Sequence, residues 1–421
     1  MSDFKFTIIG AGSTYTPELL EGFALRKESL PVKEIMLYDI NESRLAVMEG
    51  FCRRNAKRLG LDTTICATTD LARAVSGAAF INTQLRVGGN QARVNDEKIP
   101  MKHGLIGQET TGAGGFMKAL RTIPVMLDIC RVIETHAPEA WVVNYTNPTG
   151  LVAEAVSRFT NVRFTGFCSG GIFPKMWAKR ALGLDYDAVR YDYVGLNHMN
   201  FMYNLRINGR PATEAEFLAI AAQNSEIDLE LVKLLGCIPS PYLQYYYTTS
   251  RKLSRLKEAP LTRGEQVMAL EDEIYTAYAD PAADTKPAAL AKRGGGGYSD
   301  VAMGFVDAVH NDRDTWMVAN VPNNGAISFL PNDASVETAC IVNAAGVTPL
   351  KVSNIPVGVS GLIHAVKEYE QLAVEAAVEG DMRKVKLALL AHPIVREFDV
   401  IERLLPELLE ANKAYMPQFH L

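Results

Sequence analysis

The stretch FKFTIIGAGSTYTPELLEGFA, residues 4–24, predicts a strand, a glycine turn and a helix in direct succession. Glycine lets the backbone turn tightly and approach a ligand, and the N-terminus of a helix favours negative charge. We therefore expect the pyrophosphate of a dinucleotide at Gly10 and Gly12, with Ser13 as a further cofactor contact. Tyr15 occupies the position of the third glycine common in such turns, so a purely structural turn is the alternative interpretation.

An acidic residue closes the next predicted strand, EIMLYD at residues 34–39. Asp39 is placed to accept hydrogen bonds from the adenosine ribose, and its charge would repel the 2′-phosphate of NADP. The sequence therefore predicts NAD as the cofactor.

Strands and helices alternate along the first part of the chain. This alternation is typical of a parallel sheet with helices on both faces. We expect an α/β fold with a Rossmann-type doubly wound NAD-binding domain at residues 1–165. A mixed α/β domain at residues 166–421 would follow, with the active site between the two. Further strands are predicted at 64–68, 78–84 and 141–144, helices at 43–59, 120–135, 214–223 and 263–278, and a glycine-rich turn at 293–298.

Composition excludes several classes of function. The 421 residues carry a net charge of −5, which gives no general attraction to nucleic acid or to acidic membranes. No stretch is long and apolar enough for a membrane span, and no signal peptide is expected at the start. The six cysteines are scattered without C-x-x-C spacing, so most should be buried apolar fillers. These features predict a cytoplasmic protein.

Several long motifs, in a fixed order, make the sequence resemble glycoside hydrolase family 4, most closely its 6-phospho-β-glucosidase branch. The resemblance implies dependence on NAD and on Mn²⁺ or another divalent metal. It also implies a second domain similar to the C-terminal domain of lactate and malate dehydrogenases. The motifs are GAGSTYTPELLEGF (10–23), LRVGGNQARVNDEKIPMKHGLIGQETTGAGG (85–115), ALRTIPV (119–125), NYTNPTG (144–150), GLNHMNF (195–201) and YLQYYY (242–247).

The family is an exception to two-carboxylate glycoside hydrolysis. The resemblance implies that NAD takes a hydride from C3 of the sugar and that a base then removes the acidified C2 proton. A metal against O2 and O3 stabilises the enediolate, and the aglycone leaves by elimination. Water then adds and NADH returns the hydride, so there is no net oxidation.

Cys168 and His198 match the family's two metal-binding positions. A thiolate and an imidazole, completed by oxygens of the sugar, suit Mn²⁺ or a similar ion. Without the surrounding motifs, a core cysteine and a loop histidine would be the simpler interpretation. Asn197 and Asn200 flank His198, and we expect their amides to orient its ring.

Tyr242 matches the family's base for the C2 proton. A free tyrosine has a pKa of about 10, and a neighbouring divalent cation would lower that value enough for phenolate chemistry. The alternative is packing, because Tyr245, Tyr246 and Tyr247 crowd the same stretch.

Arg93, Asn147 and Arg263 match substrate-contacting positions, and Arg86 and Ser13 are further candidates for phosphate binding. An arginine fork binds a phosphate dianion through two hydrogen bonds. The substrate expected is a phosphorylated disaccharide or aryl glycoside.

Arg263 starts a predicted helix with Thr262 as its N-cap, so the helix dipole would add attraction for phosphate. The alternative for Arg263 is a surface salt bridge to Glu265 or Glu258. The loop at residues 107–115 contains several glycines, and we expect it to line the cleft rather than form the interior of an element.

Ser169 departs from the family pattern. Members specific for α-linkages carry an aspartate after the metal-binding cysteine, read as the general acid, and the β-specific branch usually carries asparagine. Serine is not a credible acid at neutral pH. We therefore expect 6-phospho-β-glucoside hydrolysis and assign no acid for the leaving group.

Other functions stay open at this point. Within the family, the substrate could be an unphosphorylated α-galactoside or uronide, or a 6-phospho-α-glucoside, although the arginines favour a phosphate. Outside it, the chain could be a simple NAD-dependent dehydrogenase or a non-catalytic sugar-phosphate sensor. A dimer or tetramer is expected, with no nucleic-acid or membrane partner.

Overall fold

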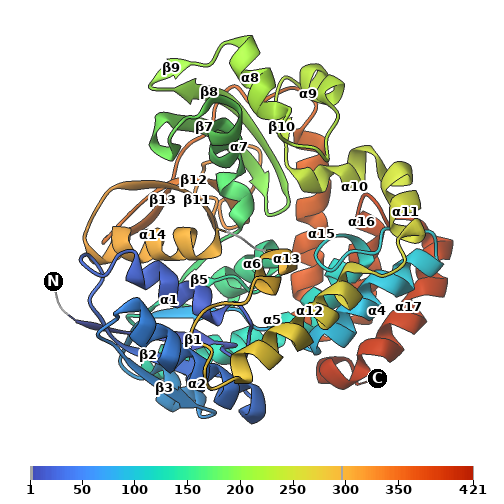
Figure 1. Cartoon of the computed structure of the whole chain (residues 1–421). Helices are drawn as coiled ribbons and strands as arrows, with labels where there is room; N and C mark the ends of the chain where they lie inside the picture. The colour runs from blue at the N-terminus through green and yellow to red at the C-terminus, as the bar shows by residue number, and fades with distance from the viewer. Residues whose placement is uncertain (1–2, 295–296, 421) are drawn as a thin grey trace.

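The chain forms one large sheet and one small sheet surrounded by helices (Figure 1). The structure is a computed structural model that describes residues 3–294 and 297–420. The nine strands of the large sheet lie in the order β13-β12-β11-β6-β5-β4-β1-β2-β3. They are β1 (Phe4–Ile9), β2 (Val32–Tyr38), β3 (Thr64–Thr68), β4 (Ala78–Thr83), β5 (Trp141–Asn144), β6 (Arg163–Gly166), β11 (Thr315–Pro322), β12 (Ser335–Asn343) and β13 (Gly346–Pro349).

The first six strands confirm the predicted doubly wound sheet. They pair in parallel in the order 3-2-1-4-5-6, which is the order of dinucleotide-binding sheets. One face packs against α1 (Thr16–Ala24), α2 (Glu42–Leu59) and α14 (Tyr298–His310). The opposite face packs against α3 (Leu71–Val75) and α5 (Gly112–His136).

The second half of the chain extends this sheet. Strands β11, β12 and β13 run antiparallel, and β11 joins β6 through the pair Asn320 and Gly166. The large sheet thus takes strands from both sides of the predicted boundary at residue 165, and the division into 1–165 and 166–421 stays a prediction. The glycine-rich turn predicted at 293–298 lies partly outside the described residues.

The small sheet forms an upper lobe in Figure 1. Its order is β10-β8-β7, and β9 pairs with β8. Helices from the C-terminal region pack beside α5 and α6 and complete the largest apolar core. The strands of the small sheet and the helices of the upper lobe and of this core are β7 (Val189–Leu196), β8 (Met199–Ile207), β9 (Arg210–Pro211), β10 (Ile238–Pro239), α6 (Thr149–Phe159), α7 (Phe173–Leu182), α8 (Glu214–Ala221), α9 (Leu229–Leu235), α15 (Ser360–Glu379), α16 (Met382–Ala391) and α17 (Phe398–Asn412).

Helix α5 begins earlier than the predicted residue 120. Gly112, Gly114 and Gly115 form its first turn, so the expectation that these glycines lie outside an element is wrong. The reason is close packing. A Cβ on Gly114 would lie 2.3 Å from the carbonyl oxygen of Asp96, and one on Gly115 would lie 2.3 Å from the carbonyl carbon of Thr110. These glycines bring α5 against α4 (Gly89–Lys102) and against the loop between the two helices.

Candidate active site

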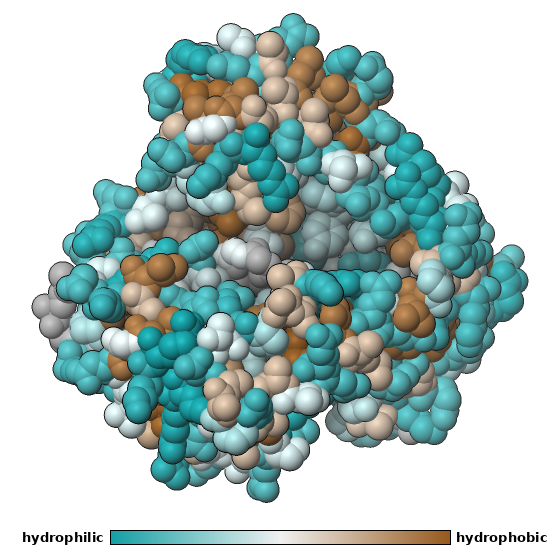
Figure 2. All heavy atoms as spheres, viewed as in Figure 1, coloured by the Kyte–Doolittle hydropathy of each residue, from teal (hydrophilic) through white to brown (hydrophobic). Residues whose placement is uncertain are grey.

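The carboxyl ends of β1, β4, β5 and β6 meet at one edge of the large sheet, and they carry most of the predicted site. Gly10 follows β1, Asn147 lies three residues after β5, and Cys168 lies two residues after β6. Because neighbouring strands lie about 4.8 Å apart, Cys168 is about 14 Å along this edge from the glycine turn. Figure 2 shows a hollow in the middle of the molecular surface, below the lobe that β7, β8, β9 and α8 form in Figure 1.

The glycine turn has the geometry of a dinucleotide site. Gly10 has φ +84°, and a Cβ there would lie 3.0 Å from the backbone of Gln84. The N–H of Gly12 donates to Asp39 Oδ2 at 2.8 Å, and a Cβ on Gly12 would lie 2.8 Å from that oxygen. Ser13 Oγ accepts from the N–H of Tyr15 at 3.3 Å. The turn therefore offers backbone without side chains, a helix N-terminus and an acid, which together fit NAD.

Cys168 and His198 face each other although thirty positions separate them in the chain. Cys168 follows β6, and His198 lies at the tip of the β7–β8 hairpin, where it adopts φ +64°. Cys168 Sγ lies 3.5 Å from His198 Nε2. The fold thus brings the two predicted metal ligands together.

Burial keeps both groups neutral in the absence of a cation. Desolvation raises the pKa of the Cys168 thiol to about 12, and the charge of Glu337 acts in the same direction. Burial lowers the pKa of His198 to about 3. A neutral imidazole is ready to bind a metal, and a cation would favour the thiolate. Among residues 3–294 and 297–420, no group of three or more His, Cys, Asp or Glu side chains is arranged for a metal. This pair fits a cation whose other ligands come from a bound molecule.

Glu337 on β12 is a site residue that the sequence analysis missed. It is 1% exposed, and it accepts hydrogen bonds from Asn197 at 3.0 Å and from Asn200 at 2.8 Å. The expectation that these two amides orient the His198 ring is therefore wrong. Tyr193 and Asn320 also donate to this carboxylate. A lone glutamate in the apolar strand sequence SVETACIVN was the available signal.

Tyr242 lies directly on the ring of His198. It belongs to a short 3-10 turn, η3 (Pro241–Leu243), and its ring stacks on the imidazole with centroids 3.6 Å apart. Tyr246 instead stacks on His392, so this neighbour has a packing role. Of the aromatic cluster, Tyr242 is the member placed against the predicted metal ligands.

Glu109, which precedes the His198 contact Thr110 in the chain, forms ion pairs with three basic side chains. Arg86 pairs with it, Arg93 Nη1 lies 3.0 Å away and Lys118 Nζ lies 2.7 Å away. Burial would raise the pKa of Glu109, but the three positive charges outweigh it and hold that pKa well below its usual range. Burial lowers the pKa of Lys118 to about 7. Glu109 lies in the loop that was expected to line the cleft, but neither Glu109 nor Lys118 was among the predicted site residues.

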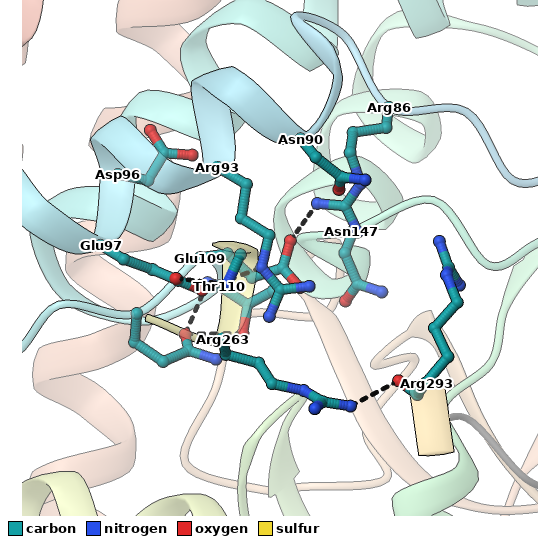
Figure 3. Close-up of polar contacts among 12 residues, drawn as sticks. Arg86, Asn90, Arg93, Asp96, Glu97, Glu109, Thr110, Asn147, Arg263 and Arg293 are labelled. Atoms are coloured by element: carbon teal, nitrogen blue, oxygen red, sulfur yellow. Dashed lines mark hydrogen bonds and ion pairs between the residues drawn. The ribbon is translucent and has the colours of Figure 1, made fainter. Parts of the chain in front are cut away.

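Arg263 points toward the same opening as Arg93. Thr262 forms the predicted N-cap of α12 (Arg263–Ala279), with a capping box to Glu265. The guanidinium of Arg263 donates to the carbonyl oxygen of Arg293 at 2.7 Å. The alternative interpretation, a salt bridge from Arg263 to Glu265, does not hold, because Glu265 pairs with Lys98 instead. Figure 3 shows Arg93, Asn147, Arg263 and Arg293 around one space.

The fold and this site define a class of NAD-binding protein in which a thiol, an imidazole and a phenol meet beside a group of arginines. The model of "Family 4 glycosyl hydrolase" matches residues 5–184, and that of its C-terminal domain matches residues 193–395. The chain belongs to family 4 of the glycosyl hydrolases.

Relatives match along almost the whole chain. A probable 6-phospho-beta-glucosidase of Bacillus subtilis is 41% identical over 99% of this chain and 98% of its own length. The 6-phospho-beta-glucosidase of Escherichia coli is 37% identical over 99% and 96%. The solved 6-phospho-beta-glucosidase of Thermotoga maritima, with NAD and glucose-6-phosphate, has a TM-score of 0.92, 32% identity and coverage of 98% and 99%. A second solved structure of that enzyme contains manganese, NAD+ and glucose-6-phosphate.

A more distant likeness bears on the fold alone. Malate dehydrogenase of Plasmodium falciparum matches with a TM-score of 0.54 at 14% identity, over 89% of this chain and 98% of its own. The predicted α/β fold, with a Rossmann-type sheet and a dehydrogenase-like second part, is confirmed.

Proposed function

We propose that this chain hydrolyses 6-phospho-β-glucosides with NAD+ and Mn²⁺ or a similar divalent ion bound. The observation that carries the proposal is the meeting of Cys168, His198 and Tyr242 at the edge of the NAD-type sheet. When bound, NAD+ supplies a hydride acceptor and the cation supplies a Lewis acid that raises the acidity of the sugar. These groups fit the glycine turn and the thiol–imidazole pair described above.

The chain's own residues hold the sugar and move one proton. Cys168 Sγ and His198 Nε2 bind the cation, and the Tyr242 phenolate takes the proton from C2. Gly10, Gly12 and Ser13 contact the pyrophosphate, and Asp39 accepts from the ribose hydroxyls.

Recognition of the 6-phosphate falls to the arginines. Arg93 and Arg263 point into one space, which Asn147 also borders (Figure 3). Burial and then the positive charge of Arg93 lower the pKa of Arg263, so the two guanidinium groups repel each other. A phosphate dianion between them would offset that repulsion. This charge balance favours a phosphorylated sugar over an unphosphorylated galactoside or a uronide.

The β-linkage is supported by the relatives named for it, at 41% and 37% identity, and by the residue after Cys168. Ser169 starts the 3-10 turn η1 (Ser169–Ile172) and offers no carboxyl group to protonate a leaving group. A 6-phospho-α-glucosidase is therefore the less favoured alternative.

No helix among the described residues is long and apolar enough to cross a membrane. We propose a cytoplasmic enzyme that forms a dimer or tetramer of identical subunits, with no nucleic-acid or membrane partner.

A cofactor-stripping assay tests the proposal. Protein freed of nucleotide and metal is given nitrophenyl α- and β-glucosides, with and without a 6-phosphate, under reducing conditions. We expect turnover of the β-linked phosphorylated compound only when NAD+ and Mn²⁺ are both returned. Full turnover without them, or net accumulation of NADH, would refute the proposed reaction. Binding without turnover of any compound would favour the sugar-phosphate sensor.

A further inference from the structure

The second nitrogen of the His198 ring ends a chain of hydrogen bonds that leads away from Cys168. His198 Nδ1 lies 3.0 Å from Thr110 Oγ1, and this hydroxyl lies 2.9 Å from Gln108 Oε1. The backbone N–H of Thr110 donates to the same amide oxygen at 2.5 Å. All three side chains are at least partly buried.

The direction of each hydrogen bond follows from what each group can do. A backbone N–H can only donate, so the Gln108 atom that receives it must be the amide oxygen. That oxygen can only accept, so the single hydroxyl proton of Thr110 points toward Gln108. The hydroxyl therefore presents a lone pair to His198, and Nδ1 must carry a proton to complete the bond.

A neutral imidazole carries only one proton, on one of its two ring nitrogens. With that proton on Nδ1, the lone pair of Nε2 is free and faces Cys168 Sγ at 3.5 Å. A histidine in the other tautomer would point an N–H at the same place and could not bind a cation there.

We propose that Thr110 and Gln108 are positioning residues that lock His198 in the Nδ1–H tautomer and so make Nε2 the metal-binding atom. For the cation itself, this inference rests on the proposed function. The start of α5 holds the locking loop in place. A Cβ on Gly114 would lie 2.4 Å from the carbonyl oxygen of Gln108, so the close packing of this glycine helps to fix the loop.

Three variants separate the hydrogen bond from packing. Thr110→Val keeps the shape but removes the hydroxyl, and Thr110→Ser restores the hydroxyl. Thr122→Val is the control, because Thr122 is a buried threonine on α5 and its Oγ1 has no hydrogen-bond partner among the described residues. ¹⁵N-labelled histidine reports the tautomer in metal-free protein. The His198 signal is one of seven and is identified by its loss in His198→Gln.

We expect the unaltered protein, Thr110→Ser and Thr122→Val to show the Nδ1–H tautomer, and Thr110→Val to show a mixture. With NAD+ and glucose-6-phosphate present to complete the site, Thr110→Val should bind Mn²⁺ about 10- to 100-fold more weakly, as expected for loss of an outer partner of a metal ligand. An Nε2–H tautomer in the unaltered protein would overturn the proposal. So would Thr110→Val with unchanged tautomer and Mn²⁺ affinity. If the unaltered protein showed the Nδ1–H tautomer but bound no Mn²⁺, the proposed function would fail instead.

Discussion

The phenol ring of Tyr242 lies face to face on the imidazole of His198, with centroids 3.6 Å apart and planes 8° apart. His198 in turn faces Cys168 through Nε2. The proposed base and the proposed metal ligands therefore form one contiguous group, so a cation at Cys168 and His198 would lie near the ring whose acidity it must raise.

Tyr242→Phe keeps this ring stack but removes the phenol oxygen. We expect turnover of a 6-phospho-β-glucoside to fall by about 10²- to 10⁴-fold, the range for loss of a general base, with NAD+ binding unchanged. Exchange of the C2 proton with D₂O, followed by NMR, should stop in this variant and continue in Tyr245→Phe. Continued exchange in Tyr242→Phe would move the base elsewhere.

Cys168→Ser replaces the soft ligand of the proposed metal site. Because loss of an outer partner already costs about 10- to 100-fold in affinity, loss of this direct ligand should cost more than about 100-fold. Electron paramagnetic resonance of free Mn²⁺ measures this without catalysis. Cys237→Ser is the control, since Cys237 is a buried cysteine outside the proposed metal site. Equal Mn²⁺ affinity in the two variants would exclude Cys168 as a ligand.

Arg263→Ala tests phosphate recognition. A hydrogen bond to a charged group contributes about 1.5–3 kcal/mol, so KM for phosphorylated substrates should rise by about 10- to 100-fold. Any activity on the unphosphorylated analogue should be unaffected. The exposed Arg255 on α11 (Thr249–Glu258) supplies the control, Arg255→Ala. An equal loss on both substrates would show that Arg263 acts by supporting the residues 292–293 rather than by binding phosphate.

The free energy of unfolding should depend on pH through the buried side chain of His392. Its ring is 1% exposed, Nε2 accepts from the N–H of Gly112 at 3.1 Å, and burial lowers the pKa of His392 to about 3. The unfolded chain takes up this proton below about pH 6.5, whereas the folded chain does not. Stability should therefore be insensitive to this group above that pH. Below it, stability should fall by up to about 1.4 kcal/mol per pH unit.

Urea unfolding at pH 7.5 and pH 5 measures this effect. In His392→Gln the loss of stability between the two pH values should be smaller than in the unaltered protein, whatever the stability of the variant at pH 7.5. His198, which has a similarly lowered pKa, is present in both proteins and cancels in the comparison. The same loss in both proteins would contradict the role assigned to His392.

The local sequence pattern was enough to predict the strands of the nucleotide-binding half of the chain. Strands β3 and β5 have the predicted bounds, because each is a short apolar run between clear turn signals. The β11–β13 extension was not predicted, because the pairing of β11 with β6, about 150 residues away in the chain, leaves no local signal in the sequence. The start of α5 was missed because glycine lowers helix propensity, whereas here close packing outweighs that cost.

The candidate active site could likewise be predicted only in part from the sequence. Motif positions identified Cys168, His198 and Tyr242, which the fold brings into contact. Thr110, which contacts the His198 ring, and Glu337, which binds the asparagines on either side of His198, come from distant segments of the chain. Only the folded chain shows which polar group each one meets. Asn197 and Asn200 were expected to contact the His198 ring because they flank it in the sequence. In the fold they donate to the buried carboxylate of Glu337 instead.

Anomalous X-ray scattering from crystals grown with Mn²⁺ and NAD+ tests the central claim most directly. The account predicts a manganese peak within about 2.5 Å of both Cys168 Sγ and His198 Nε2, the range of metal–ligand bonds. A manganese peak bound elsewhere, with this sulfur and this nitrogen still facing each other across an empty gap, would contradict it.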